Sequence, residues 1–277
     1  MTIHHWIKQS PLPRLESRML LQAVLGLSSV QIVTHSERKL NHQELQQLNS
    51  LQQRRMNGEP MAYILGEREF YGRVFCVDKS VLIPRPETEL LLETALFRLP
   101  ETPAIVWDLG CGSGILAISL KLQRPDCIVW ASDISDNALK IAHKNAERHQ
   151  AQIEWTQGDW YDCFRLPEKN SVDMMISNPP YIAHNDAHLT QGDLRFEPQN
   201  ALTDFADGLT AYQTLINGAG RFLKNGGEIW FEHGFNQAAD IRQLLQNAGF
   251  SNIQTFQDLA GLDRVTGGVF QAGCNTV

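Results

Sequence analysis

The feature that most constrains the fold is a glycine-rich segment at residues 106–115, Val-Trp-Asp-Leu-Gly-Cys-Gly-Ser-Gly-Ile. Its apolar first half predicts a strand that ends at Asp108, and apolar residues at helical spacing follow the last glycine. Gly110, Gly112 and Gly114 allow the backbone to turn tightly and to approach a ligand without Cβ clashes. A strand, a glycine loop and a helix N-terminus in this order predict a ligand site above the strand.

Strand and helix patterns alternate through the rest of the chain. Predicted strands cover residues 104–109, 127–132, 153–157, 172–177 and 228–232, and two closing strands cover 252–257 and 269–272. Predicted helices cover residues 87–99, 114–122, 137–149, 209–223 and 237–248. Repeated β-α units predict a Rossmann-like α/β fold, with a mostly parallel sheet and helices on both faces. Ligands in such folds bind outside the carboxyl ends of the strands.

The first quarter of the chain predicts helices instead. Apolar residues recur three and four positions apart from Leu15 to Leu27, and Gly26 marks the end of that helix. A second helix begins after Asn41, because Glu44 completes a capping-box pattern there. Short helices of this kind predict a small bundle, which is more typical of packing or partner docking than of catalysis.

We therefore expect three parts: a helical bundle at residues 1–65 that docks a target, a hairpin linker at 66–80, and the α/β domain at 81–277. The net charge of −7 divides into +3 for residues 1–80 and −10 for the remainder. An acidic larger part argues against a broad phosphate-binding surface, so we expect no direct nucleic-acid binding.

The cysteines favour a reducing compartment, and we expect a cytoplasmic protein. They are scattered, odd in number and without a Cys-x-x-Cys pair: Cys76, Cys111, Cys127, Cys163 and Cys274. Neither a secretory signal nor an apolar run of membrane-spanning length occurs in the sequence, so no membrane association is expected.

A dinucleotide-binding loop is the main alternative for the glycine segment, but its fingerprint is Gly-x-Gly-x-x-Gly. Here the third glycine comes one residue early, and Ile115 takes the final glycine's place. The segment instead resembles the Rossmann-like S-adenosylmethionine methyltransferases. That resemblance implies a loop wrapped around the methionine part of the cofactor, formed by Asp108, Gly110, Cys111, Gly112, Ser113 and Gly114.

Two later strand ends carry residues suited to the rest of that cofactor. Asp133 ends the next predicted strand, and its two carboxylate oxygens can accept hydrogen bonds from two vicinal ribose hydroxyls. Asp159 can accept from the exocyclic amine of adenine, and the Trp160 indole can cover the ring. Each residue alone also fits an ordinary strand-end cap or core position, but their order along the chain matches the order expected for cofactor binding.

The segment Asn178-Pro179-Pro180-Tyr181 follows the fourth predicted strand and is the N-P-P-Y box of methyltransferases that modify planar nitrogens. Such a nitrogen is a poor nucleophile because its lone pair is delocalised. Two oxygen acceptors, the Asn178 side chain and the Pro179 carbonyl, can hold its two N–H groups and stabilise the positive charge that develops on it. The prolines stiffen the loop, and Tyr181 can stack on the planar group. A simple proline turn is the structural alternative.

The whole chain resembles the HemK/PrmC family. The resemblance rests on Gly66–Gly72, Leu82–Glu89, the glycine loop, the N-P-P-Y box, Arg195–Pro198 and the helical front end. It implies methyl transfer from S-adenosylmethionine to the glutamine side-chain amide in the Gly-Gly-Gln motif of class 1 peptide-chain release factors. It also implies that Asn178 contacts both cofactor and target, and that the target side includes Pro179, Pro180, Tyr181 and Glu197.

Other functions and sites stay open at this stage. A related family methylates a glutamine of a large-subunit ribosomal protein, and nucleic-acid adenine methyltransferases share the N-P-P-Y box. A non-catalytic binding module is a third possibility. Glu197 also fits a turn cap. His184 and His188 flank Asp186, but no third ligand is placed by the sequence, so no metal site is expected.

Overall fold

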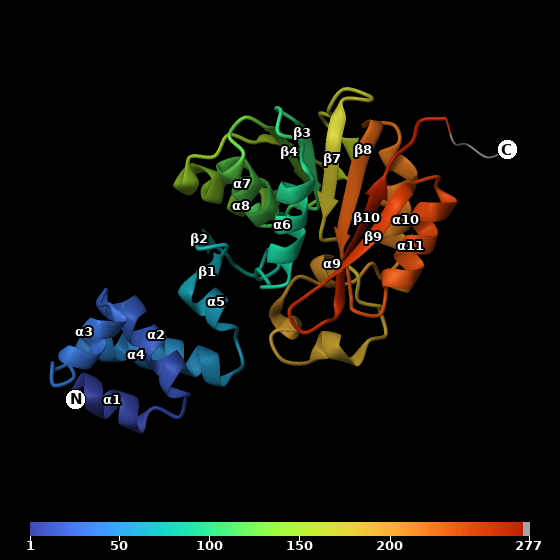
Figure 1. Cartoon of the computed structure of the whole chain (residues 1–277). Coiled ribbons are helices and arrows are strands. Elements are labelled where there is room, and N and C mark those ends of the chain that lie inside the picture. The colour runs from blue at the N-terminus through green and yellow to red at the C-terminus, as the bar shows by residue number, and fades with distance from the viewer. Residues whose placement is uncertain (274–277) are drawn as a thin grey trace.

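The computed structural model describes residues 1–273, and a mixed sheet of eight strands forms its centre. The strands are β3 Ile105–Leu109, β4 Ile128–Asp133, β5 Glu154–Asp159, β6 Asp162–Cys163, β7 Val172–Ser177, β8 Leu223–Glu232, β9 Ser251–Gln257 and β10 Asp263–Val269. They lie in the order β6-β5-β4-β3-β7-β8-β10-β9 (Figure 1). The five strands from β5 to β8 in this order are parallel, and β6, β9 and β10 pair antiparallel. The predicted α/β fold is therefore confirmed.

Helices cover both faces of the sheet (Figure 1). One face carries α6 Thr88–Arg98, α7 Ile115–Gln123 and α8 Asp136–His149, and the other carries α10 Thr210–Ala219 and α11 Ala238–Asn247. Successive side chains of β3 point to opposite faces of the sheet, so this strand packs against both helix layers. Val106 packs with the α6 and α7 side chains, whereas the next residue, Trp107, packs with those of α10. Buried apolar residues on both faces make the sheet a rigid support for the loops at its edge.

The chain order reverses between β3 and β7, which are neighbours at the centre of the sheet. β4 and β5 extend the sheet to one side of this point, and β8 extends it to the other. The hydroxyl of Ser177 at the end of β7 donates to the carbonyl of Leu109 at the end of β3, at 2.6 Å. The carboxyl ends of the parallel strands therefore meet at one edge, at a topological switch point.

One predicted strand was wrong in position: the closing strand expected at 269–272 is β10, at Asp263–Val269. The Gly267-Gly268 pair disfavours a strand on local propensity. In the folded chain, a Cβ on Gly267 would lie 2.2 Å from the Ile229 carbonyl oxygen and 2.4 Å from the Trp230 ring. Close packing against Trp230 therefore favours glycine at position 267. Because glycine has a low strand propensity, the sequence pattern does not reveal this strand. The two-residue strand β6 was also not predicted.

Five short helices precede the sheet: α1 Ile3–Gln9, α2 Arg14–Leu25, α3 Ser29–Thr34, α4 His42–Met56 and α5 Met61–Leu65. They enclose a separate small core that includes Trp6, Leu20 and Leu48. The predicted capping box of α4 is confirmed, since Asn41 and Glu44 exchange two hydrogen bonds of 2.9 Å. The expected place of Leu15 in the buried stripe is wrong. It lies in the first turn of α2 and is 72% exposed, because the stripe follows Ser17, Leu20 and Leu21.

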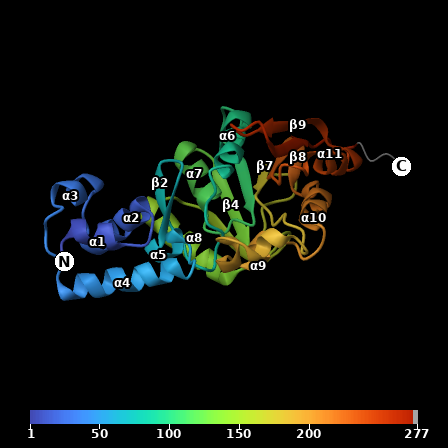
Figure 2. The same cartoon turned by 90° about the horizontal axis from the view of Figure 1, so that it is seen from below.

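Two segments connect the bundle to the sheet. The first is the antiparallel hairpin of β1 Glu67–Phe70 and β2 Arg73–Cys76. The second is the long loop after β7, which contains η1 Ala187–Thr190, η2 Leu194–Phe196 and α9 Gln199–Leu202. Arg195 in this loop donates to the Asn57 carbonyl at 3.2 Å. The loop therefore bridges the end of α4 and the carboxyl edge of the sheet (Figure 2).

No helix within residues 1–273 has the length and apolar character needed to cross a membrane. The four cysteines in this part of the chain are free thiols, and Cys274 lies outside the described residues.

Candidate active site

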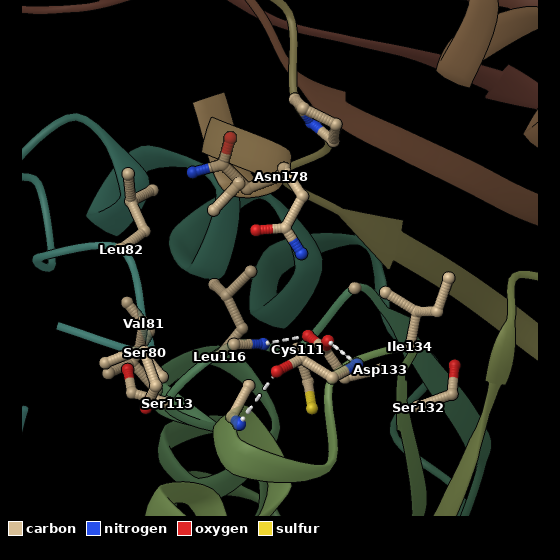
Figure 3. Close-up of a pocket in the computed structure, with 18 of the residues that line it drawn as sticks. Ser80, Val81, Leu82, Cys111, Ser113, Leu116, Ser132, Asp133, Ile134 and Asn178 are labelled. Carbon is tan, nitrogen blue, oxygen red and sulfur yellow. Dashed lines mark hydrogen bonds between the residues drawn. The ribbon is translucent and has the colours of Figure 1, made fainter. Parts of the chain in front are cut away.

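A pocket opens at the carboxyl edge of the sheet, beside the switch point (Figure 3). Its walls come from the segment before α6, the glycine loop, the ends of β4, β5 and β7, and α9. Nine of the residues predicted from sequence line it: Gly110, Cys111, Gly112, Ser113, Asp133, Asp159, Trp160, Asn178 and Pro180. Five others do not line it: Asp108, Gly114, Pro179, Tyr181 and Glu197.

The glycine loop folds over the end of β4. The N–H groups of Gly110 and Cys111 both donate to the Ser132 carbonyl at 2.9 Å. The N–H of Gly112 donates to the Asp133 carboxylate at 2.8 Å. Nothing in the described residues lies within 4 Å of the place a Cβ on Gly112 would take. The loop is thus held by main-chain contacts on one side and leaves its other side open to a ligand.

The Asp133 carboxylate forms part of the pocket wall. One oxygen accepts from Gly112 N, and the other accepts from Ser135 N at 2.9 Å. Burial raises the pKa of Asp133, and these main-chain donors oppose that shift. Each oxygen keeps a further lone pair, so the carboxylate can accept from two hydroxyls of a ligand.

Asp108 lies beneath the glycine loop, not on the pocket wall. It is fully buried; one oxygen accepts from Ala117 N at 3.1 Å, and the other has no hydrogen-bond partner among residues 1–273. Burial raises the pKa of Asp108 to about 7. Gly114 also lies behind the loop, where a Cβ would meet the side chains of Ile118 and Trp155 at 3.0 and 3.1 Å. Both residues therefore support the loop from below in this structure.

The turn after β5 closes one end of the pocket. Asp159 ends the strand and pairs with Asp162 across the β5–β6 hairpin. Trp160 occupies the turn with a φ of 51°, and its half-buried ring lies against the glycine loop. A Cβ on Gly110 would lie 3.2 Å from that ring. Glycine at this position therefore permits the close approach of the indole to the loop.

The Asn178 side chain enters the pocket from the end of β7, on the side opposite Asp133 (Figure 3). Its Nδ2 donates to the hydroxyl oxygen of Thr88 at 3.3 Å. With the nitrogen anchored in this way, the Oδ1 atom has no partner in the described part of the chain and is available to a ligand. The structure thus brings Asn178 and the cofactor-type residues of the glycine loop into one cavity.

The rest of the N-P-P-Y box is fixed from behind. Pro179 is buried, and Tyr181 packs half-buried against the core on the α10 face. The Gln237 side chain donates to the Tyr181 carbonyl at 3.0 Å and accepts from Gly234 N at 2.9 Å. Burial raises the pKa of the Tyr181 hydroxyl. The box is therefore tied to the turn after β8 by a side chain that sequence reasoning did not identify.

Glu197 lies outside the pocket and binds the segment that forms one of its walls. Its buried carboxylate pairs with the Arg85 guanidinium and accepts from Ile83 N at 3.0 Å. Burial raises the pKa of Glu197, while Arg85 and the Ile83 N–H oppose that shift. The two segments that were singled out separately, Leu82–Glu89 and Arg195–Pro198, are therefore joined by one partly buried ion pair.

Asn145 is a further residue that the sequence interpretation missed. It is fully buried on α8, and its amide bonds the main chain of Cys76 and the carbonyl of Ser113. It thereby connects the hairpin to the glycine loop. A signal was present, because an asparagine at helical spacing after Ala138 and Ala142 on a buried stripe requires polar partners.

The His184–His188 segment forms a local turn. Asp186 accepts from His188 N at 2.9 Å and lies 2.6 Å from its ring nitrogen, and both side chains are exposed. No cluster of three or more metal-ligating side chains occurs within residues 1–273.

Comparison with known families gives two separate matches. Residues 85–195 match the methyltransferase small domain, and residues 6–66 match the PrmC N-terminal domain. Among solved structures, a methyltransferase from Pyrococcus furiosus has a TM-score of 0.55 at 16% identity, covering 80% of this chain and 98% of its own. A 16S rRNA methyltransferase from T. thermophilus has a TM-score of 0.54 at 20% identity, covering 74% and 50%. These structures support the methyltransferase fold.

Curated relatives match over nearly the whole chain. A release factor glutamine methyltransferase from Neisseria gonorrhoeae is 52% identical, covering 98% of both chains. The enzyme of the same name from Salmonella typhimurium is 38% identical over 98% of this chain and 99% of its own, and that from Escherichia coli is 38% identical over 96% and 98%. With this similarity added to a glycine loop that shares one cavity with Asn178 and Pro180 of the N-P-P-Y box, the chain belongs to the release factor glutamine methyltransferase family.

Proposed function

We propose that this protein transfers a methyl group from S-adenosylmethionine to the side-chain amide nitrogen of the glutamine in the Gly-Gly-Gln motif of class 1 release factors. This modification would support translation termination, and a translation factor as target places the reaction in the cytoplasm. The observation that carries the proposal is the meeting of Asn178 with the glycine loop in one pocket, in a chain similar to release factor glutamine methyltransferases along its full length.

The pocket fits the cofactor on its β3–β5 side. Asp133 presents a carboxylate at the wall for the ribose hydroxyls, and Trp160 presents an indole for the adenine ring. Gly110, Cys111, Gly112 and Ser113 offer a main-chain surface for the methionine part. When bound, S-adenosylmethionine supplies an electrophilic methyl group on a sulfonium. We also assign three further residues to the cofactor side. Asp108 and Gly114 support the glycine loop from behind, and the exposed Asp159 lines the pocket.

The target amide fits the β7 side of the pocket. Asn178 Oδ1 and the Pro179 carbonyl accept the two N–H groups of the glutamine, which localises the nitrogen lone pair and stabilises the charge that develops on transfer. We assign Tyr181 to the face of the planar group, although it does not line the pocket in this structure, and Pro180 shapes the wall. Glu197 contributes indirectly, because it holds the Arg85 segment. The acceptors are fixed before the target binds, so little ordering remains to be done.

The helical part serves target capture in this proposal. We assign residues 1–65 to docking, 66–80 to the linker and 81–277 to methyl transfer. The support is the contact between Arg195 and the end of α4, which joins the bundle to the loop beside the pocket. No direct nucleic-acid contact is part of the proposal.

Incubation with labelled S-adenosylmethionine and an unmethylated release factor tests the proposed function. Label should appear on one glutamine, and a release factor with asparagine at that position should stay unlabelled. Parallel reactions offer large-subunit ribosomal proteins, DNA and RNA. Transfer to one of these, with none to the release factor, would replace the proposed target, and no transfer to any acceptor would contradict methyl transfer itself.

A further inference from the structure

A buried carboxyl group, Glu232, lies behind the target side of the pocket. Glu232 is 1% exposed and is the last residue of β8. Ser177 pairs with Phe231 in the parallel β7–β8 register, so Asn178 and Glu232 occupy the next positions on adjacent strands. The Tyr212 hydroxyl donates to the Glu232 main-chain carbonyl at 2.9 Å. The backbone around Glu232 is therefore fixed, yet its side chain has no part in the function described above.

The Glu232 carboxyl has polar neighbours on the pocket side. Its Oε2 atom makes no hydrogen bond within residues 1–273. The side chains of Thr88 and Asn178 adjoin the carboxyl and favour its charged form. Thr88 in turn accepts from Asn178 Nδ2 at 3.3 Å. Glu232, Thr88 and Asn178 thus form one cluster that extends from the buried end of β8 to the pocket wall.

The direction of the hydroxyl proton decides which end of the asparagine amide faces Thr88. A hydroxyl donates one proton and accepts through its lone pairs. If the Thr88 proton points to the Glu232 carboxylate, the hydroxyl oxygen accepts from Asn178 Nδ2, and Oδ1 turns toward the pocket. If the proton points to Asn178, the amide is favoured in the reversed orientation and presents donors to the target N–H groups.

We propose that Glu232 is a positioning residue that, through Thr88, holds the Asn178 amide with its oxygen toward the target nitrogen. The inference deepens the proposed function and rests on it for the identity of the target. Its structural content, the Asn178–Thr88 hydrogen bond beside the buried Glu232 carboxyl, is independent of which planar nitrogen is methylated. The donation from the Thr88 hydroxyl to Glu232 is part of the proposal. The same relay selects the amide orientation before any target enters the pocket.

Protonation of Glu232 reverses the relay. Burial raises the pKa of Glu232 to about 7; Glu87 raises it further, and Thr88, Asn178 and Arg264 lower it. Burial raises the pKa of the Tyr181 and Tyr212 hydroxyls, and the charge of the same carboxyl raises it further. A protonated Glu232 can donate to the Thr88 oxygen, which sends the Thr88 proton toward Asn178. Turnover should therefore fall as the pH decreases through about 7.

The first test compares Thr88→Val, Thr88→Ser and the matched control Thr94→Val, a buried threonine on the same helix. With an unmethylated release factor as acceptor, Thr88→Val should lower kcat by about 10- to 100-fold. The KM for the release factor and the Kd for S-adenosylmethionine should change less than about threefold. Thr88→Ser, which keeps the hydroxyl, should recover most of kcat, and Thr94→Val should behave as the wild type. Full turnover in Thr88→Val, or equal losses in both Thr88 variants, would overturn the relay.

The second test needs no acceptor protein. Glu232 is followed by carboxyl-carbon NMR during a pH titration, with Glu232→Gln identifying the signal. Loss of the Thr88 hydroxyl should raise the pKa of Glu232 in Thr88→Val, whereas Thr88→Ser should leave it in place. In kinetics, Glu232→Gln should lose the inflection near pH 7. An unchanged Glu232 titration in Thr88→Val would overturn the inference even if the release factor is methylated. Failure of the wild type to methylate any acceptor would instead contradict the proposed function.

Discussion

The two halves of the pocket are held by different kinds of contact. On the cofactor side, the ends of β3, β4 and β5 are connected mainly by main-chain groups and short loops, such as the N–H groups of Gly110 and Cys111 on the Ser132 carbonyl. On the target side, the end of β7 is held by side chains from distant parts of the sequence. Thr88 bonds Asn178, and Gln237 bonds the carbonyl of Tyr181.

This difference has a physical origin. A glycine loop shapes itself by backbone conformations that neighbouring residues control, so a contiguous motif can encode it. A side-chain acceptor for a target must be oriented by groups that solvent cannot replace, and only distant elements packed over the site can supply them. Apart from Asn145, which bonds the Ser113 carbonyl, the cofactor side should therefore tolerate changes in distant elements better than the target side does.

Removal of the Asn178 amide should break the target side alone, with the largest effect. In Asn178→Ala, kcat should fall by about 100- to 1000-fold, because one of two preorganised acceptors is lost. Cofactor affinity should fall less than about 10-fold, the value of one neutral hydrogen bond. Single-turnover transfer and calorimetric titration with S-adenosylmethionine separate the two. Asn200→Ala removes another asparagine that lines the pocket, and this control should lose far less turnover. Equal losses of turnover and of cofactor affinity in Asn178→Ala would contradict the difference between the two sides.

Loss of Arg85 should show how strongly the target side depends on a long-range pair. Arg85→Ala leaves the buried Glu197 carboxylate without its guanidinium, so the free energy of unfolding should fall by about 3 kcal/mol. Urea denaturation measures this change. Lys140→Ala removes an exposed pair with Asp136 and should have a much smaller effect. Similar losses in the two variants would mean that the Arg85–Glu197 pair behaves as a surface contact.

Asp108 provides a pH-dependent probe of the cofactor side. Its pKa is raised from 3.8 to about 7, so its contribution to stability is greatest below its unfolded value and is lost as the pH rises through about 7. Between about pH 6 and pH 8.5, the loss amounts to about 1.4 kcal/mol for a group with this shift. Asp108→Asn should lack that part of the pH dependence in cofactor-free urea denaturation. Asp159→Asn, at an exposed position, is the control. If the free energy of unfolding of Asp108→Asn depended on pH as steeply as that of the wild type, the raised pKa of the buried Asp108 carboxyl would be contradicted.

The smallest effect is expected for Gly110→Ala, which perturbs the cofactor side locally. The residue has a φ of 76°, and the new Cβ would lie 3.2 Å from the Trp160 ring. Cofactor affinity should fall by about 10-fold as the indole is displaced. Gly66→Ala has a similar φ of 74° with no atom within 4 Å, so it shares only the backbone strain. If both substitutions lower the affinity for the cofactor equally, the contact with Trp160 does not contribute to cofactor binding.

Much of the fold was accessible from the sequence because its signals are local. The glycine loop, the Asn41–Glu44 capping box and the alternation of strands and helices all depend on neighbouring residues. The N-P-P-Y segment was accessible for the same reason. The strand at 263–269, which was predicted at the wrong position, shows the limit of local signals. Glycine at position 267 lowers the local strand propensity, and it is favoured there by the Trp230 ring on a neighbouring strand.

The sequence by itself determined the α/β class, the cofactor-type loop and the box that holds a planar nitrogen. Only the tertiary structure decided that Asp108 supports the loop from below, that Glu197 binds the Arg85 segment, and that Thr88 and Glu232 lie behind Asn178. The reason is the length of chain between the partners. A contact between residues 88 and 178 or 85 and 197 leaves no local pattern, because packing of the whole sheet edge brings those side chains together.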